Sequence, residues 1–165
     1  MTHDELVRVA LAWLMNQARC AFAGIEQQSW GPEIPDAIGW DVDSSIVVEC
    51  KATRADFLSD QKKPHRNGEH SLGRYRYYLV PQGLVTVDEV PDGWGLLEHR
   101  ESGHKAGYYV KKMKDAPEHP RERHHYRAEV RYLVLMSVRF SNAIKTLGRF
   151  AWMERAALLP REEDG

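Results

Sequence analysis

Hydrophobic residues near the start of the chain recur with the three- and four-residue spacing of a helix face. They occupy Leu6, Val9, Ala10, Trp13, Leu14 and Ala18. Thr2 and Glu5 form a capping-box pattern, in which a hydroxyl and a carboxylate accept hydrogen bonds from unpaired backbone amides at a helix start. Gly24 is typical of a helix end or a turn. The pattern therefore predicts a helix over residues 2–22.

Between residues 25 and 51 the pattern changes to short β-rich runs. Strands are predicted at Ile25–Trp30 and at Ile34–Trp40, separated by the Gly31-Pro32 break. Asp41-Val42-Asp43-Ser44 has the composition of a turn. The next run, Ser45–Lys51, is rich in β-branched residues and predicts a third strand. We therefore expect three strands, the last two joined by a tight turn.

A second capping pattern follows the third strand. Thr53 has an acid, Asp56, three residues further along, so we expect a short helix from about Arg54 to Lys62. Pro64 would stop this helix, because proline lacks the amide hydrogen that a helix interior needs.

The remaining chain predicts more strands and then a helix. An aromatic strand is expected at Tyr75–Val80, and weaker patterns indicate strands at Gly93–Glu98 and Gly107–Lys112. Residues 121–159 contain no proline and only one glycine. Within them Tyr132–Phe140 could also pass for a strand, so periodicity leaves both open and length favours a helix. Together these elements predict an α/β fold with a mixed central sheet flanked by helices and a C-terminal helix.

Composition places the chain among ordinary globular proteins. Of its 165 residues, 42% are hydrophobic and 28% are charged, which suits one domain with a sizeable core. We expect a single domain over residues 1–159, with a core at about 3–112, a helical segment at about 121–159 and a disordered tail at 160–165.

The cysteines and the apolar runs limit the cellular compartments in which the protein is expected. No run of about 18 apolar residues occurs, so no membrane span and no membrane partner are expected. Cys20 and Cys50 are too few for a disulfide framework, and the chain has no Cys-x-x-Cys pair that would suggest a zinc ribbon. We expect free, buried thiols in a cytoplasmic protein.

Charged residues are segregated along the chain, and this segregation indicates possible ligands that the net charge does not. The net charge is only −1, yet residues 26–50 contain six acidic residues and no Lys or Arg. Residues 51–80 and residues 105–131 each have a surplus of four positive charges. A hard cation such as Mg²⁺ suits the first segment, and a phosphate backbone suits the two basic ones.

The candidate chemistry lies at the Pro35-Asp36 pair and at Glu49-Cys50-Lys51. Side chains alternate along a strand, so Glu49 and Lys51 should share one face while Cys50 points toward the core. A tight turn would bring Asp36 close to Glu49. Two carboxylates and the Cys50 backbone carbonyl would supply half of an octahedral oxygen site for Mg²⁺ or Mn²⁺.

Lys51 would then lie beside the metal ion. Its ammonium could hold or activate the attacking water, or offset the charge that builds on a phosphorus centre during hydrolysis. Phosphodiester hydrolysis needs neutralised charge, an aligned nucleophile and a stabilised leaving oxygen. A carboxylate pair with an adjacent cation provides most of these.

At Pro35, Asp36, Glu49 and Lys51 the sequence resembles the PD-(D/E)xK nuclease superfamily, which has the restriction-endonuclease-like three-layer fold. The resemblance covers about residues 3–80. The run from Glu49 to Asp60 is similar to MmcB-like DNA-repair proteins and to related phage and prophage proteins, in which a Glu-x-Lys strand leads into a Ser/Thr-Arg-Ala-Asp-Phe helix. The resemblance implies a Mg²⁺-dependent nuclease that acts on DNA in repair, recombination or phage DNA processing.

The resemblance also implies a fourth acidic residue from the first helix or the strand after it. Glu26 is the candidate, with Glu5 as the second choice. The predicted catalytic residues are thus Asp36, Glu49, Lys51 and Glu26. Basic residues near the motif are the predicted DNA contacts: Arg54, Lys62, Lys63, Arg66 and Arg74.

Three interpretations remain open at this point. The chain could be a metal-dependent deoxyribonuclease, or a nuclease-like fold that binds DNA or a protein partner without cutting. It could also be a small α/β protein whose acidic segment is structural. The segment after Arg121 could cover the core or form a homodimer through its helix.

Overall fold

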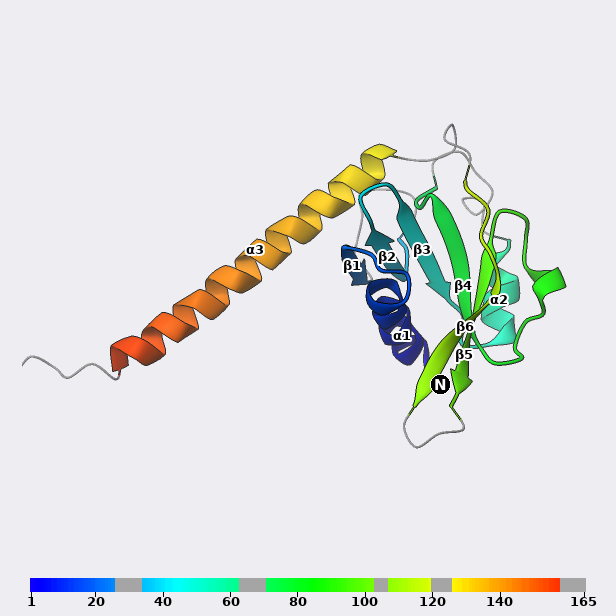
Figure 1. Cartoon of the computed structure of the whole chain (residues 1–165), viewed down its shortest axis with the longest axis horizontal. Coiled ribbons are helices and arrows are strands. Elements are labelled where there is room, and N and C mark those ends of the chain that lie inside the picture. The colour runs from blue at the N-terminus through cyan, green and yellow to red at the C-terminus, as the bar shows by residue number, and fades with distance from the viewer. Residues whose placement is uncertain (26–33, 63–70, 103–106, 120–125, 158–165) are drawn as a thin grey trace, which may run out of the picture. The chain divides into compact units, whose positions relative to one another are not determined.

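The computed structural model describes residues 1–25, 34–62, 71–102, 107–119 and 126–157, with side chains up to residue 146 (Figure 1). The chain divides into two compact units, residues 1–129 and 130–165. The first unit contains all of the described strands, the two α-helices at residues 3–16 and 54–60, the start of the C-terminal helix and the candidate site. The second consists, in its described part, of the C-terminal helix.

Six strands form one mixed sheet in the order β1-β2-β3-β4-β5-β6. The three strands β1, β2 and β3 are antiparallel neighbours, β3, β4 and β5 run parallel, and β6 returns antiparallel to β5. The bounds of the strands are β1 Phe22–Ile25, β2 Ala37–Trp40, β3 Ser45–Cys50, β4 Tyr75–Pro81, β5 Gly95–Glu101 and β6 Tyr108–Lys114.

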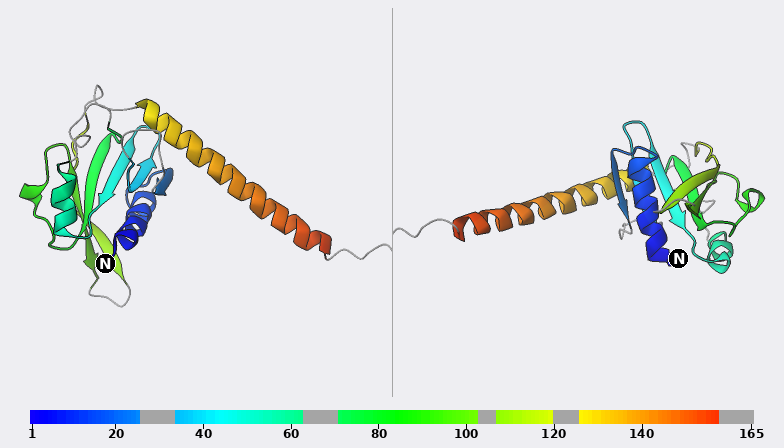
Figure 2. Two further views of the ribbon diagram at one scale, coloured as in Figure 1. Left: turned by 180° about the vertical axis from the view of Figure 1, so that it is seen from behind. Right: turned by 60° about the horizontal axis from the view of Figure 1, so that its bottom comes forward.

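Helices cover both faces of this sheet (Figure 2). Helix α1 (His3–Asn16) contacts β1, β2 and β3, and its buried side chains share a core with Val48, Cys50 and Leu79. On the opposite face, Phe57 of α2 (Arg54–Asp60) packs with Tyr78 and other apolar side chains of the segment up to β5. The predicted α/β fold with a mixed central sheet between helices is confirmed. A short 3₁₀ turn, η2 (Val87–Glu89), lies between β4 and β5.

Helix α1 begins as predicted but ends earlier. Thr2 and Glu5 form the expected capping box. The helix stops at Asn16 rather than at residue 22, because Arg19 adopts a positive φ of 59° and the Cys20 amide donates to the Leu14 carbonyl at 2.9 Å. The chain therefore turns back toward β1, and Gly24 lies inside that strand rather than at a helix end.

The other predicted elements keep their type and shift at their ends. β3 ends one residue before the predicted Lys51, and α2 ends at Asp60 rather than Lys62. The predicted turn forms, since the Asp41 amide donates to the Ser44 carbonyl at 2.8 Å. The predicted strand at residues 25–30 overlaps β1 only at Ile25, and residues 26–33 lie outside the described part of the chain.

The C-terminal segment is helical throughout its described length. Helix α3 spans Tyr126–Ala157, so Tyr132–Phe140 is helix and not strand. Large apolar side chains are exposed along it at Val130, Val134, Leu135, Val138, Phe140 and Ile144. None of the helices in the described ranges is long and apolar enough to span a membrane.

Both cysteines are free and buried, as predicted. Burial, followed by the nearby Asp41 carboxylate, raises the pKa of the Cys20 thiol to about 11. A thiol with such a pKa stays protonated near neutral pH and is a poor nucleophile. Cys20 is therefore a packing residue between α1 and the sheet.

Substituting Gly39 should destabilise this packing. An added Cβ would lie 2.7 Å from Cys20 Sγ and 3.1 Å from Leu14 Cδ2. Overpacking of this kind costs about 1–3 kcal/mol, so Gly39→Ala should lower the free energy of unfolding by that amount in urea titrations. The loss should shrink in a Cys20→Ala background, where the closest contact is gone. Equal losses in both backgrounds would contradict this explanation.

Candidate active site

The end of β3 places Glu49 and Lys51 on the face of the sheet that α2 covers. Val48 and Cys50 point to the opposite face and belong to the core shared with α1. This alternation is as predicted. Beyond the strand, the Lys51 amide donates to the Leu79 carbonyl of β4 at 3.0 Å, so the backbone that carries the motif is held by the neighbouring parallel strand.

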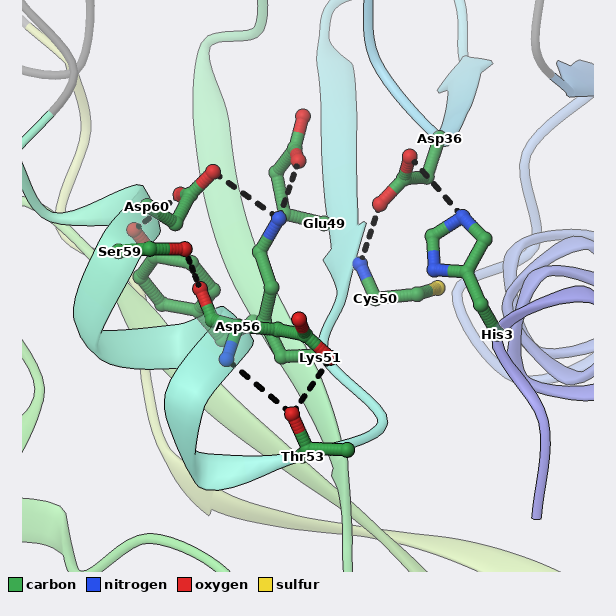
Figure 3. A network of polar contacts seen from close by, with 10 residues as sticks. His3, Asp36, Glu49, Cys50, Lys51, Thr53, Asp56, Ser59 and Asp60 are labelled. Carbon is green, nitrogen blue, oxygen red and sulfur yellow. Dashed lines mark hydrogen bonds and ion pairs between the residues drawn. The ribbon is translucent and has the colours of Figure 1, made fainter.

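Lys51 lies between two carboxylates (Figure 3). Its Nζ is 3.2 Å from Glu49 Oε2 and 3.0 Å from Asp60 Oδ1. All three side chains are at least nine-tenths buried. Asp60 is the last residue of α2, and its Oδ2 accepts a hydrogen bond from the Tyr78 hydroxyl at 3.0 Å.

Asp36 lies on the other side of the β3 end (Figure 3). It directly precedes Ala37, which pairs with Val48 in the antiparallel register, so Asp36 is held beside the motif. Its Oδ2 accepts a hydrogen bond from the Cys50 amide at 2.7 Å, and its Oδ1 is 3.5 Å from His3 Nε2. Asp36 therefore lies beside the Cys50 backbone of the Glu-x-Lys motif, and the approach of its carboxylate to that of Glu49 stays a prediction.

Burial and charge together alter the protonation of Asp36. Desolvation, followed by the negative charge of Glu49, raises the pKa of Asp36 to about 6. The Cys50 amide, Lys51 and His3 act in the opposite direction and are outweighed. A carboxylate with a raised pKa beside a second carboxylate is typical of a functional site, where charge is concentrated at a cost in stability.

The raised pKa of Asp36 predicts that Asp36→Asn stabilises the fold at neutral pH. The folded-state pKa of about 6 lies above the ordinary 3.8, so ionisation of Asp36 disfavours folding. Its favourable contribution is complete below pH 3.8 and is lost as the pH rises through about 6. By linkage the ionised group costs on the order of 1–3 kcal/mol. The amide keeps an oxygen for the Cys50 N–H.

Urea unfolding without divalent cations, at about pH 7.5 and about pH 4.5, checks this expectation. The free energy of unfolding of the variant should exceed that of the wild type at the higher pH. The difference between the two should shrink steadily toward the lower pH. A difference that does not change with pH would contradict the assigned titration.

Lys51 is held in its charged form. Burial acts to lower its pKa, but the carboxylates of Glu49, Asp60 and Asp36 outweigh it and raise the pKa of Lys51 above its ordinary value. At neutral pH the side chain is therefore an ammonium ion. Of the roles predicted from sequence, holding water or offsetting charge fits this state, whereas removing a proton from water does not.

Among the described residues, the carboxylates of the site do not form a complete metal cage. Within the described ranges no group of three or more His, Cys, Asp or Glu side chains could hold a metal ion together. Mg²⁺ commonly binds through one or two carboxylates and completes its shell with water and substrate phosphate. Asp36 and Glu49 are donors of the type that this mode uses. Their binding of one metal ion, and the contribution of the Cys50 carbonyl, stay predictions.

The remaining predicted site residues fall into two groups. Glu26, Lys63 and Arg66 lie outside the described residues. Glu5 is exposed and caps α1, with its Oε2 2.7 Å from the Thr2 amide nitrogen. It serves the helix start, as the sequence pattern indicated.

The predicted DNA contacts in the described part differ in their surroundings. Lys62 is exposed. Arg54 forms an ion pair with Glu89 and holds the pKa of that carboxyl down to about 2, mainly through its hydrogen bond. Arg74 lies 2.9 Å from Glu118 Oε1 and donates to the Asp43 carbonyl at 2.8 Å. The two arginines thus have protein partners, and DNA would have to compete with acidic side chains for them.

Sequence reasoning missed Asp60 as a member of the site. Asp56 and Asp60 are one helical turn apart, yet Asp56 is exposed and accepts from Thr53 Oγ1 at 2.6 Å, whereas Asp60 is 1% exposed. One signal was available. Asp60 follows the buried Phe57 by three residues, so it lies on the apolar face of α2, where an acid needs a partner.

Comparisons with known proteins show a shared fold and no family. No family model matches the chain, and no curated protein matches it. The chain is similar in structure to SPO1766 from Silicibacter pomeroyi, a protein of unknown function, with a TM-score of 0.57 and 20% sequence identity. The match covers 99% of each chain. At this identity the similarity extends to the fold alone.

Proposed function

We propose that the protein is a metal-dependent deoxyribonuclease of the PD-(D/E)xK superfamily, related to MmcB-like DNA-repair and phage proteins. The observation that carries the proposal is the buried Glu49–Lys51–Asp60 cluster beside Asp36, whose pKa is raised to about 6. A sheet that needed only to fold would gain more from apolar side chains at these positions.

The charge of the cluster supports a cation site. Asp36, Glu49 and Asp60 together carry three negative charges when ionised, and Lys51 neutralises one of them. The pKa of Asp36 is raised mainly by burial, and the negative charge of Glu49 adds to this rise. A divalent cation between Asp36 and Glu49 would offset the negative charge that Lys51 does not neutralise.

The residues of the site would share the work of hydrolysis. Asp36 and Glu49 would hold Mg²⁺ or Mn²⁺, which when bound polarises a phosphate oxygen and lowers the pKa of a bound water. Lys51, kept as an ammonium, would stabilise the negative charge that develops on the phosphate in the transition state. The Cys50 amide would keep Asp36 in place through its 2.7 Å hydrogen bond.

Cleavage assays with purified protein test the proposal. Single-stranded, nicked, branched and linear duplex DNA would each be incubated with Mg²⁺, with Mn²⁺ and with chelator. We expect cleavage that requires the metal ion and disappears in Asp36→Ala. No cleavage of any substrate under any metal condition would overturn the nuclease proposal.

A second candidate function is a nuclease-like fold that binds DNA or a protein partner without cutting. The observation in its favour is that Lys51 is already paired with both Glu49 and Asp60, an arrangement that could be wholly structural. DNA binding that weakens with salt, with no cleavage in the same preparations, would support this alternative.

A further inference from the structure

We propose that Asp60 is a positioning residue that holds Lys51 and thereby leaves Glu49 available to bind a divalent cation. The inference deepens the proposed function and rests on it. The starting observation is that Lys51 Nζ contacts two carboxylates of different origin, Glu49 on β3 and Asp60 on α2.

Glu49 alone could not serve both cations well. An ammonium and a metal ion would compete for the same carboxylate, and a buried ammonium that lost its only partner would carry a large desolvation cost. Asp60 removes this conflict. At 3.0 Å from Nζ it keeps Lys51 in an ion pair when Glu49 turns toward a metal ion.

Asp60 is itself held in a rigid setting. Its Oδ2 accepts from the Tyr78 hydroxyl, and the Tyr78 ring stacks on Trp94 with centroids 4.3 Å apart. Phe57 packs edge-on against the same ring at 5.1 Å. Tyr78 is fully buried, so its hydroxyl has a defined position. Such outer partners orient the groups nearer the metal and affect its affinity.

The arrangement also defines which way Lys51 should move. When a cation occupies Glu49, Lys51 keeps Asp60 as its main partner and stays beside the reacting phosphate. Without the Asp60 charge, Lys51 would pair more strongly with Glu49, and the metal ion would have to displace it. Asp60 therefore acts through Lys51 and contacts neither metal ion nor substrate.

Mn²⁺ affinity of the full chain tests this role. The affinity would be measured from the electron paramagnetic resonance signal of free Mn²⁺, at neutral pH, for the wild type, Asp60→Asn and Tyr78→Phe. We expect Asp60→Asn to raise the Kd for Mn²⁺ about 10-fold or more, and Tyr78→Phe to raise it by a smaller factor. Urea unfolding would establish that each variant is folded.

Asp56→Asn is the matched control. It removes the same charge from the same helix at an exposed carboxylate and keeps an oxygen for the Thr53 hydroxyl. We expect its Kd to stay within about twofold of the wild type, because exposed charges are screened. An Asp60→Asn variant that binds Mn²⁺ as tightly as Asp56→Asn would overturn the inference.

A double-mutant cycle separates action through Lys51 from a direct effect of the Asp60 charge. In a Lys51→Met background, Asp60→Asn should change the Kd for Mn²⁺ little, because the ammonium that it positions is gone. An equal weakening in both backgrounds would overturn the positioning role. A wild type that binds no Mn²⁺ would instead overturn the proposed function, and with it the inference.

Discussion

Replacing Lys51 with methionine should both destabilise the protein and strongly slow DNA cleavage. The ammonium is the shared partner of Glu49 and Asp60, whose side chains are 2% and 1% exposed. Removing it leaves two buried carboxylates without this cation. Breaking a buried pair in this way costs about 3–5 kcal/mol, and loss of a group that stabilises the transition state lowers the cleavage rate about 10²–10³-fold.

Urea unfolding and cleavage assays would measure the two effects of Lys51→Met. Adding Glu49→Gln and Asp60→Asn should recover most of the stability without restoring cleavage. This combination separates loss of chemistry from loss of folding.

Lys112→Met is the matched control for Lys51→Met. Lys112 pairs with Asp115, but both side chains are largely exposed. Exposed ion pairs contribute less than about 1 kcal/mol, so the free energy of unfolding of this variant should remain near that of the wild type. If Lys51→Met costs no more stability than Lys112→Met, the buried cluster does not have the energetic weight assigned to it.

Glu49→Gln should strongly slow metal-dependent cleavage while the fold is retained. The amide is similar in size and keeps an oxygen for Lys51, but it is a much weaker ligand for Mg²⁺. A bound metal ion contributes several kcal/mol of transition-state stabilisation, so we expect the rate to fall about 10³-fold. Thermal unfolding should also become insensitive to Mg²⁺, because a cation stabilises only a fold that binds it.

A second readout of Glu49→Gln follows from the Asp36 titration. The charge of Glu49 is one cause of the raised pKa of Asp36, so the variant should move that pKa down toward its ordinary value. Carbon-detected NMR of the Asp36 carboxyl would measure the shift. Glu101→Gln, an exposed change of the same type at the end of β5, should leave cleavage and the titration unchanged. Full cleavage by Glu49→Gln would refute the assigned metal site.

Most of the first unit could be predicted from neighbouring residues. The β-branched run before Glu49 predicts a strand and its alternation, and Thr53 with Asp56 predicts the helix that follows. These features depend on backbone sterics and on hydrogen bonds over three or four residues. The end of α1 could not be predicted as well, because the positive φ of Arg19 and the Cys20–Leu14 hydrogen bond depend on where the sheet begins.

The candidate site also combines features that depend on neighbouring residues with features that depend on the fold. Strand alternation predicts that Glu49 and Lys51 share a face, and the Pro-Asp and Glu-x-Lys segments indicate that Asp36 lies close to the motif. The packed fold was needed to show that Asp60 is the second partner of Lys51 and that Arg54 is paired with Glu89. The two kinds of feature differ in the sequence distance over which the interactions act. Strand alternation is a local property of the backbone, whereas the partner of a buried charge is determined by how α2 packs on the sheet.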